Sequence, residues 1–254
     1  MQFKTKRSKF SGIFFLALCG LLHTAVTWAE TADVEPEADK ILKQMSVYLA
    51  GLNKFSITSH STIDTAIDSG QKIMIDHYNT ASISRPNKLF ITRNGDAVEQ
   101  SFYYDGKSFT LHSHLHNYYA TVDAPANLSD TLAWAIDKFD LTAPGADLLY
   151  KDSYERLSNE LISGFYVGKG LIDGVECHHL AFRNAEVDWQ IWIQTGDKPL
   201  PKRYVITSRW ITGGPQFSLN MKWNTRPDFS NDLFNFVAPE KALRIELQSN
   251  PASN

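Results

Sequence analysis

The sequence predicts an α+β fold in which one long antiparallel sheet is accompanied by a few helices. Outside the helical stretches, apolar and polar residues alternate with period two, as they do in half-buried strands. Turn dipeptides such as Asp105-Gly106 and Asp173-Gly174 separate the alternating runs, as in hairpins. Spacings of three and four between apolar residues are confined to residues 36–52 and to a mid-chain interruption at 129–150. Together these patterns predict a meander of short strands with helices packed beside it.

The N-terminus has the composition of a sorting signal. Four basic residues and no acid occur in the first 29 positions, followed by an apolar run at 13–26 and then Thr27-Trp28-Ala29. This order predicts a Sec-type signal peptide cleaved after Ala29, export to the periplasm, and one mature domain over residues 30–254.

Two alternatives to a cleaved signal peptide remain open. An uncleaved anchor is one, but the apolar run of 14 residues is shorter than the roughly 20 that span a bilayer. A lipoprotein signal with Cys19 as the modified residue is the other, although Leu18 occupies a position that normally requires a small residue. We therefore expect a protein that is not integral to the membrane.

The mature chain is acidic and has one cysteine. Without the four basic residues of the signal, 21 basic residues face 28 acidic ones, a net charge of −7 over 225 residues. This balance argues against a nucleic-acid partner and against electrostatic binding to anionic lipid. Cys177 is the remaining cysteine, so no intramolecular disulfide is expected, and we expect its thiol to be buried.

The helices are predicted from apolar spacing and terminal residues. In residues 36–52, Ile41 and Met45 share one face, with Pro36 in the first turn and Gly51 at the end. The mid-chain helix is predicted to begin at a Ser129 cap and to bury a face that consists of Leu132, Ala135, Ile136 and Phe139. A short helical piece is expected after Pro144 and a third at 153–162.

The strands are predicted in two groups on either side of the mid-chain helices. The first group comprises residues 57–64, 72–84, a strand within 85–95, 100–104, 108–112 and 118–122. The second comprises residues 164–172, 175–183, 187–194, 201–210 and 216–225. The aromatic tail that contains Phe229, Leu233, Phe234 and Phe236 is expected to pack over the sheet.

Three stretches resemble the domain-of-unknown-function family 2092 of predicted periplasmic proteins, within the LolA/LolB-like lipoprotein-carrier group. They are SRPNKLFI at 84–91, YYDGKSFTLHSHLHNYYATVDAP at 103–125 and GVECHHLAFRNAEVDWQIWIQTGDKPLPKRYVIT at 174–207. The resemblance implies a strongly curved, incomplete antiparallel barrel with helices that lid its concave face. In better-understood relatives, the hollow inside the incomplete barrel holds acyl chains. The resemblance supplies no catalytic residue.

The candidate site is a set of apolar side chains on the predicted concave face. The predicted cavity-lining residues are Trp134, Trp189, Ile191, Phe217, Leu219, Met221 and Trp223. The leading interpretation is a non-enzymatic carrier or chaperone-like protein that binds a lipid or acyl chain. An envelope sensor or adaptor with a protein partner and, less directly, a hydrolase are the alternatives. Equally open is a core in which these side chains pack only against one another.

No cofactor, metal site or catalytic residue is expected. A predicted turn at 114–117 separates His112 from His114 and His116, and the adjacent His178 and His179 point to opposite sides of a strand that also contains Cys177. The strings G-x-S-x-G and H-E-x-x-H and a phosphate-binding loop are missing from the sequence. Arg183 and Arg209 are expected to face solvent, where either meets an anionic head group only if it lies at the rim of the hollow.

Overall fold

The computed structural model describes residues 32–67, 69–96, 98–141 and 143–249. Internal contacts divide the chain into residues 1–31 and residues 32–254, and everything described belongs to the second unit. The predicted signal peptide and its cleavage site therefore lie outside the described residues.

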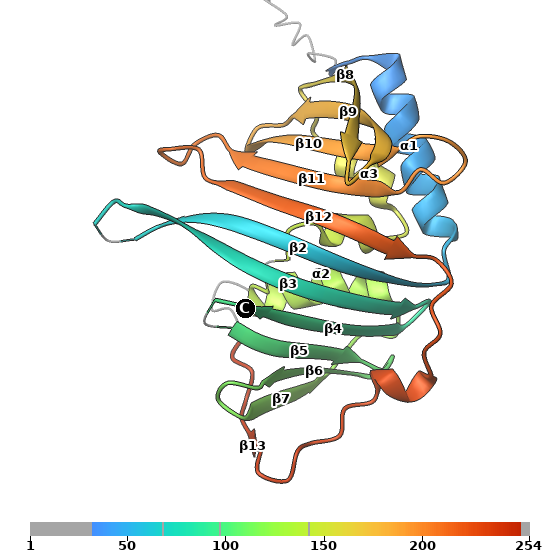
Figure 1. Cartoon of the computed structure of the whole chain (residues 1–254). Helices are drawn as coiled ribbons and strands as arrows, with labels where there is room; N and C mark the ends of the chain where they lie inside the picture. Colours follow the sequence, from blue (N-terminus) through green and yellow to red (C-terminus); the bar gives the residue numbers. More distant parts are fainter. Residues whose placement is uncertain (1–31, 68, 97, 142, 250–254) are drawn as a thin grey trace, which may run out of the picture. The chain divides into compact units, whose positions relative to one another are not determined.

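The described strands form one sheet of 13 strands (Figure 1). Their order is β1-β8-β9-β10-β11-β12-β2-β3-β4-β5-β6-β7-β13. The first meander comprises β2 (Lys54–Ala66), β3 (Lys72–Ser84), β4 (Lys88–Gly95), β5 (Val98–Tyr104), β6 (Ser108–Ser113) and β7 (Tyr118–Asp123). The second comprises β8 (Ser163–Ile172), β9 (Val175–Arg183), β10 (Val187–Gln194), β11 (Pro201–Ser208) and β12 (Gln216–Asn224). Two-residue strands, β1 (Asp33–Val34) and β13 (Leu243–Arg244), pair in parallel with β8 and β7 at the two ends.

The two meanders become one sheet because β12 pairs antiparallel with β2. Phe217 lies opposite Ile63 and Trp223 lies opposite Ile57, so the apolar face of β12 continues onto β2. The two ends of the sheet do not pair with each other, and the sheet curves without closing. The predicted curved, incomplete barrel is confirmed.

The helices lie on one face of this sheet, which we call the concave face. They are α1 (Pro36–Gly51), α2 (Leu128–Phe139), α3 (Ser153–Ser158) and the 3-10 turn η1 (Ala146–Leu149). A second 3-10 turn, η2 (Asn231–Phe234), belongs to the tail. Helix α1 contacts α3, η1 and β8, whereas the Trp134 ring of α2 packs edge-to-face on Phe109 of β6. The helices therefore cover two separate parts of the sheet.

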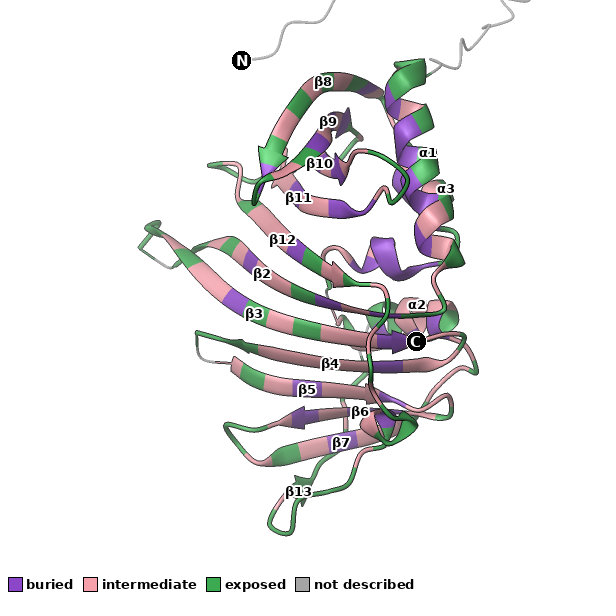
Figure 2. Cartoon of the chain, turned by 45° about the vertical axis from the view of Figure 1, so that its right-hand side comes forward, coloured by how far each residue is buried: buried purple, intermediate pink, exposed green. Residues whose placement is uncertain are grey.

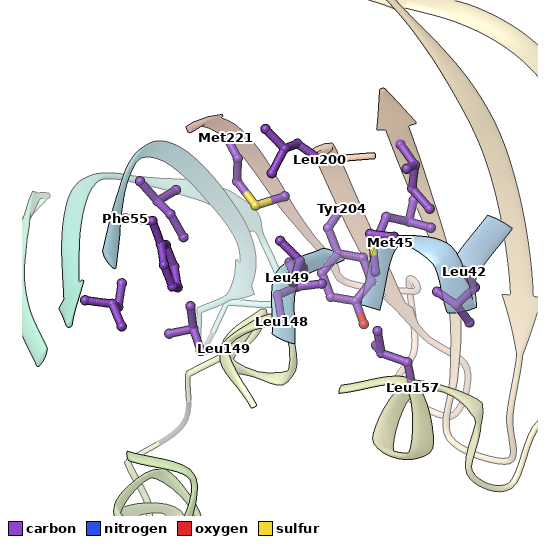
Figure 3. Close-up of a cluster of buried hydrophobic side chains, with 14 of the residues drawn as sticks. Leu42, Met45, Leu49, Phe55, Leu148, Leu149, Leu157, Leu200, Tyr204 and Met221 are labelled. Carbon is purple, nitrogen blue, oxygen red and sulfur yellow. The ribbon is translucent and has the colours of Figure 1, made fainter. Parts of the chain in front are cut away.

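The main core lies between α1 and the second meander (Figure 3). Leu42, Met45 and Leu49 lie on the buried face of α1, at spacings of three and four. They pack with Tyr204 of β11 and Met221 of β12. The other residues labelled in Figure 3 are Phe55, Leu148, Leu149, Leu157 and Leu200. This packing fixes the curvature of β8–β12 around the helix.

Helix α2 begins earlier than predicted, and its buried face matches the prediction only in part. The side chain of Asn127, not that of Ser129, caps the helix by accepting a hydrogen bond from the Asp130 amide at 2.9 Å. The buried residues are Leu128, Thr131 and Ala135, and Leu132 packs against the core cluster. The predicted face is therefore confirmed at Leu132 and Ala135 and wrong at Ile136, which is 38% exposed.

The aromatic tail packs on the convex face of the sheet, in line with the prediction that it covers strands. The ring of Phe236 lies 5.2 Å from Tyr103, 5.6 Å from His112 and 5.1 Å from Tyr119, centroid to centroid. Phe234 is fully buried. The tail therefore covers part of the outer side of β5–β7, where Tyr103, His112 and Tyr119 meet the Phe236 ring.

Burial is uneven along the strands. Figure 2 shows that buried residues gather at the strand ends near α1, whereas the hairpin tips at the opposite ends are exposed. At these tips Ile67 is 42% exposed, Trp210 71% and Ile211 60%. The half of the concave face that leads toward the tips is therefore the less covered half.

We predict that Leu42→Ala lowers the free energy of unfolding by about 2–5 kcal/mol, because it removes a fully buried side chain from the α1 interface. Val47→Ala, on the exposed face of the same helix, serves as the control and is expected to change it by less than about 0.5 kcal/mol. Urea denaturation followed by circular dichroism measures both. Equal effects of the two substitutions would contradict the assignment of the core to this helix face.

Candidate ligand-binding face

Three of the tentative site residues are part of the packed core. Trp189 is 3% exposed, Ile191 0% and Met221 3%. The Trp189 ring stacks on Phe182 at 4.3 Å and meets Tyr204 edge-on at 5.7 Å. These side chains already pack against other core side chains and are not exposed to a ligand. They form a filled layer, which we call the floor, beneath the concave face.

The three other site residues on β12 are only partly buried. Leu219 lies beneath Gly145, where an added Cβ would come within 2.8 Å of the Leu219 Cδ2 atom. The Trp223 ring stacks on Phe55 at 5.6 Å, and its Nε1 atom donates to the carbonyl of Pro201 at 2.7 Å. Phe217 lies further toward the hairpin tips and is not packed against the core cluster.

Trp134 is separated from the other six residues. It lies on α2, where its ring contacts Phe109 of β6 at 6.4 Å and Phe139 at 4.9 Å. Strands β2 to β5 lie between β6 and β12 in the sheet. The structure therefore brings together the residues of β10 and β12 but not the tryptophan of α2.

An open apolar row crosses the concave face beside the packed core. It consists of Ile206, Phe217, Ile63 and Ile75, which are successive cross-strand partners on β11, β12, β2 and β3. Ile63 is 36% exposed, and the other three are partly exposed. Of the four, only Ile206 packs against the core cluster. The helices therefore leave an apolar strip on the inner side of the sheet.

A polar patch interrupts the concave face next to this row, and sequence reasoning missed it. It consists of Ser61, His77, Asn79 and Arg93, and the strand registers place all four on the same face as Phe217. His77 follows Ile75 at the next inward position of β3, and Arg93 lies directly opposite Asn79. The alternation within 57–64 and 72–84 indicates which residues of one strand share a face. Only the observed strand registers show that these residues of different strands lie together.

The polar patch has few internal hydrogen bonds. An Nη2 hydrogen of Arg93 is donated to Nε2 of His77 at 3.0 Å, and Nδ2 of Asn79 donates to Oγ of Ser61 at 3.3 Å. Burial, and secondarily the charge of Arg93, lower the pKa of His77 below its usual range. His77 is therefore neutral at neutral pH and acts as an acceptor toward the guanidinium.

The histidines and the cysteine are explained by local packing. Oγ of Ser101 lies 2.8 Å from Nε2 of His114, and the His179 ring stacks on Trp192 at 4.0 Å. Cys177 is fully buried, as predicted, and burial raises the pKa of its thiol. Within the described ranges, no group of three or more His, Cys, Asp and Glu side chains is arranged to hold a metal ion.

The two arginines that were expected to face solvent bond to neighbouring loop and strand atoms. Arg183 is exposed and forms a two-pronged ion pair with Asp188. Nη1 of Arg209 donates to the carbonyls of Asn184 and Ala185. These contacts indicate no role for Arg183 or Arg209 on the concave face. The arginine described above on that face is Arg93.

The fold and this face define the class of protein: an open, curved antiparallel sheet whose concave side is partly lidded by helices. The chain belongs to the family described as "Predicted periplasmic protein (DUF2092)", whose model matches residues 38–248. This confirms the predicted family. No match was found among curated proteins.

Several solved structures are similar to this chain. An uncharacterized conserved protein from Thermus thermophilus has a TM-score of 0.48 at 10% identity, over 83% of this chain and 99% of that one. LprF from Mycobacterium bovis has a TM-score of 0.48 at 14% identity, over 82% and 98%. The LolA superfamily protein NE2245 from Nitrosomonas europaea has a TM-score of 0.37 at 11% identity, over 78% and 97%.

Among the helices that the structure describes, none combines the length and the apolar character needed to cross a bilayer.

We predict that the protein loses stability as the pH falls from about 7 to about 5, and that His112 contributes to this loss. His112 is 4% exposed, its Nε2 atom is buried without a hydrogen-bond partner, and its ring lies 4.2 Å from that of His114. Burial, and then the nearby His114, lower the pKa of His112 below its usual value of about 6.5. The unfolded chain therefore binds the proton first, so stability present above about pH 6.5 is lost below it.

Urea denaturation at several pH values tests this effect. His112→Gln is expected to flatten the pH dependence, whereas the same change at the exposed His116 is expected to leave the slope unchanged. Equal slopes in the wild type and His112→Gln would show that His112 does not contribute.

Proposed function

We propose that the protein is a non-enzymatic periplasmic carrier or chaperone-like protein that binds a lipid or acyl chain on its concave face. The proposal includes export by a signal peptide cleaved after Ala29. The observation that carries it is the open apolar row, which exposes Phe217, Ile63 and Ile75 to solvent on the inner side of the sheet. An acyl chain that covers this row replaces water on apolar surface.

An acyl chain is expected to bind with an affinity sufficient for a carrier, even without a polar motif that recognises it. Burial of an alkyl chain contributes about 0.8 kcal/mol per methylene, so a dozen methylenes contribute about 10 kcal/mol before the cost of association. After that cost, a dissociation constant near the micromolar range is expected.

The tentative site residues take distinct places in this proposal. Phe217 contacts the ligand directly, Leu219 lies at the inner boundary of the row, and Trp223 lies further along β12, stacked on Phe55. Trp189, Ile191 and Met221 support the floor, and Trp134 belongs to the lid. Ligand exchange would then involve movement of the lid segment 129–150, which the first meander contacts through Trp134 and Phe109.

Intact mass spectrometry under native conditions tests the proposal on protein isolated from the periplasm without detergent. A co-purifying lipid is expected, as is a change in tryptophan fluorescence when a fatty acid or lysolipid is added. Absence of both signals would contradict a carrier role.

We predict that Phe217→Asp weakens acyl-chain binding at least about tenfold, because it places a charge on the apolar row. Ser218→Asp adds the same charge to the opposite face of the same strand and is the matched control. Fluorescence titration with a lysolipid measures both dissociation constants. An unchanged affinity in Phe217→Asp would place the ligand elsewhere.

A second candidate function, an envelope sensor or adaptor, is favoured by the edge strand β8. Strand β1 pairs with β8 only at Ser163 and Gly164. Beyond them Phe165 is 50% exposed, Val167 47% and Leu171 71%. An open edge with apolar side chains accepts a strand from another protein.

If β8 is a docking edge, a photocrosslinker at Val167 is expected to capture one specific envelope protein in cells. The same group at the exposed Thr80, on the paired strand β3, is expected to capture none. Identical product patterns from the two positions would count against an adaptor role.

A further inference from the structure

The guanidinium of Arg93 has hydrogen-bonding capacity to spare on the concave face. Its one hydrogen bond to the described residues is to the neutral His77 ring, although a guanidinium has five N–H donors. Among the described residues, no carboxylate forms an ion pair with it. None of its nitrogens is among the buried atoms without partners, so the free donors reach solvent.

The two acids whose charges act on His77, Asp76 and Asp96, are engaged with other groups. The carboxyl of Asp76 bonds to His60, which lies on the convex face, and the carboxyl of Asp96 accepts the Asp76 amide hydrogen at 3.3 Å. Burial lowers the pKa of Arg93, but a guanidinium stays charged at neutral pH. The concave face therefore holds a partly desolvated positive charge with no ion-pair partner among the residues that the structure describes.

This charge lies beside the open apolar row. Along β3, Ile75 belongs to the row, His77 follows at the next inward position, and Asn79 after it lies opposite Arg93. From β3 the row extends across β2 and β12 to β11, which are three strand spacings or about 14 Å. An apolar strip thus begins next to a cation.

We propose that the concave face binds a single-chain amphiphile with an anionic head, a carboxylate or a phosphate monoester, whose head group is held by Arg93. The alkyl chain lies along Ile75, Ile63, Phe217 and Ile206. Asn79 and Gln100 flank Arg93 as its cross-strand neighbours and supply further donors to the head group. This inference rests on the proposed function and adds the chemical class of the ligand.

The test compares ligands that share one chain and differ in charge. Binding of dodecanoate, dodecyl phosphate and dodecanol to the full protein is measured by tryptophan fluorescence and calorimetry at neutral pH. Acetate and inorganic phosphate are measured alongside. Both anionic chains are expected to bind about tenfold or more tightly than dodecanol, since a hydrogen bond to a charged group is worth more than a neutral one.

Variants then locate the charge preference. Arg93→Gln is expected to bring the three chains to within about twofold of one another without weakening dodecanol binding. Arg203→Gln, which removes an arginine that bonds Asn220 on the convex face, is the control and keeps the preference. Asn79→Asp places a carboxylate opposite Arg93 and is expected to abolish the preference as well, so the test does not depend on one variant. Thermal unfolding confirms that each variant is folded.

The outcomes separate the two proposals. Equal affinities for the charged and neutral chains in the wild type, or a preference that survives in Arg93→Gln, would overturn the role of Arg93 while leaving acyl-chain binding intact. Inorganic phosphate or acetate that binds as tightly as the long-chain anions would define a site for a free anion instead and overturn the amphiphile. Failure of all three chain-bearing ligands to bind would overturn the carrier proposal, and this inference with it.

Discussion

The packing of α1 against the concave face is the interaction on which the rest of the structure depends. Leu42, Met45 and Leu49 supply the apolar cover that β8–β12 require, together with η1 and α3. The available cover is limited. Helix α1 has 16 residues and is about 24 Å long, whereas 13 strands extend about 58 Å across the sheet. A helix of this length covers less than half of that width.

The chain meets this shortfall by changing the chemistry of the uncovered face. One position across β2 to β6 is polar on every strand, and the residues are Ser59, Asn79, Arg93, Gln100 and Ser113. A polar side chain can remain hydrated where no helix covers it. The apolar row through Phe217 does not follow this pattern, since three of its four residues lie outside the core cluster yet are apolar. Exposed apolar strips of this kind mark interaction sites more often than ordinary surface.

The succession of strands along the chain could be predicted from the sequence, because alternation and turn residues are local signals. Asp105-Gly106 and Asp173-Gly174 are turns between strands in the structure, and the alternation of Phe217 and its neighbours is a strand with one inward face. Helix α2 was placed correctly, but its cap was not, because Asn127 and Ser129 are both good caps and only the tertiary contacts of Leu128 choose between them.

The candidate site could be predicted only in part, since coverage is a property of the assembled sheet. Trp189 and Phe217 occupy equivalent inward positions of their strands, yet Trp189 is in the core and Phe217 is outside it. The polar patch depends on registers. His77 and Arg93 are 16 residues apart, and a change of one residue in the pairing of β3 with β4 would send Arg93 to the convex side.

Arg93 is difficult to explain by stability alone. A partly buried charge loses hydration, and a carboxylate partner or an apolar replacement would avoid that loss. His77 provides neither, because a neutral imidazole accepts one hydrogen bond and leaves the positive charge uncompensated. Because His77 accepts only one hydrogen bond, the remaining N–H donors of Arg93 stay available on the part of the concave face that the helices do not cover. A cation that is desolvated by its surroundings but not neutralised by them binds an anion more strongly than an exposed lysine or arginine would. The arrangement is therefore costly for an empty protein and favourable for one whose ligand brings its own negative charge.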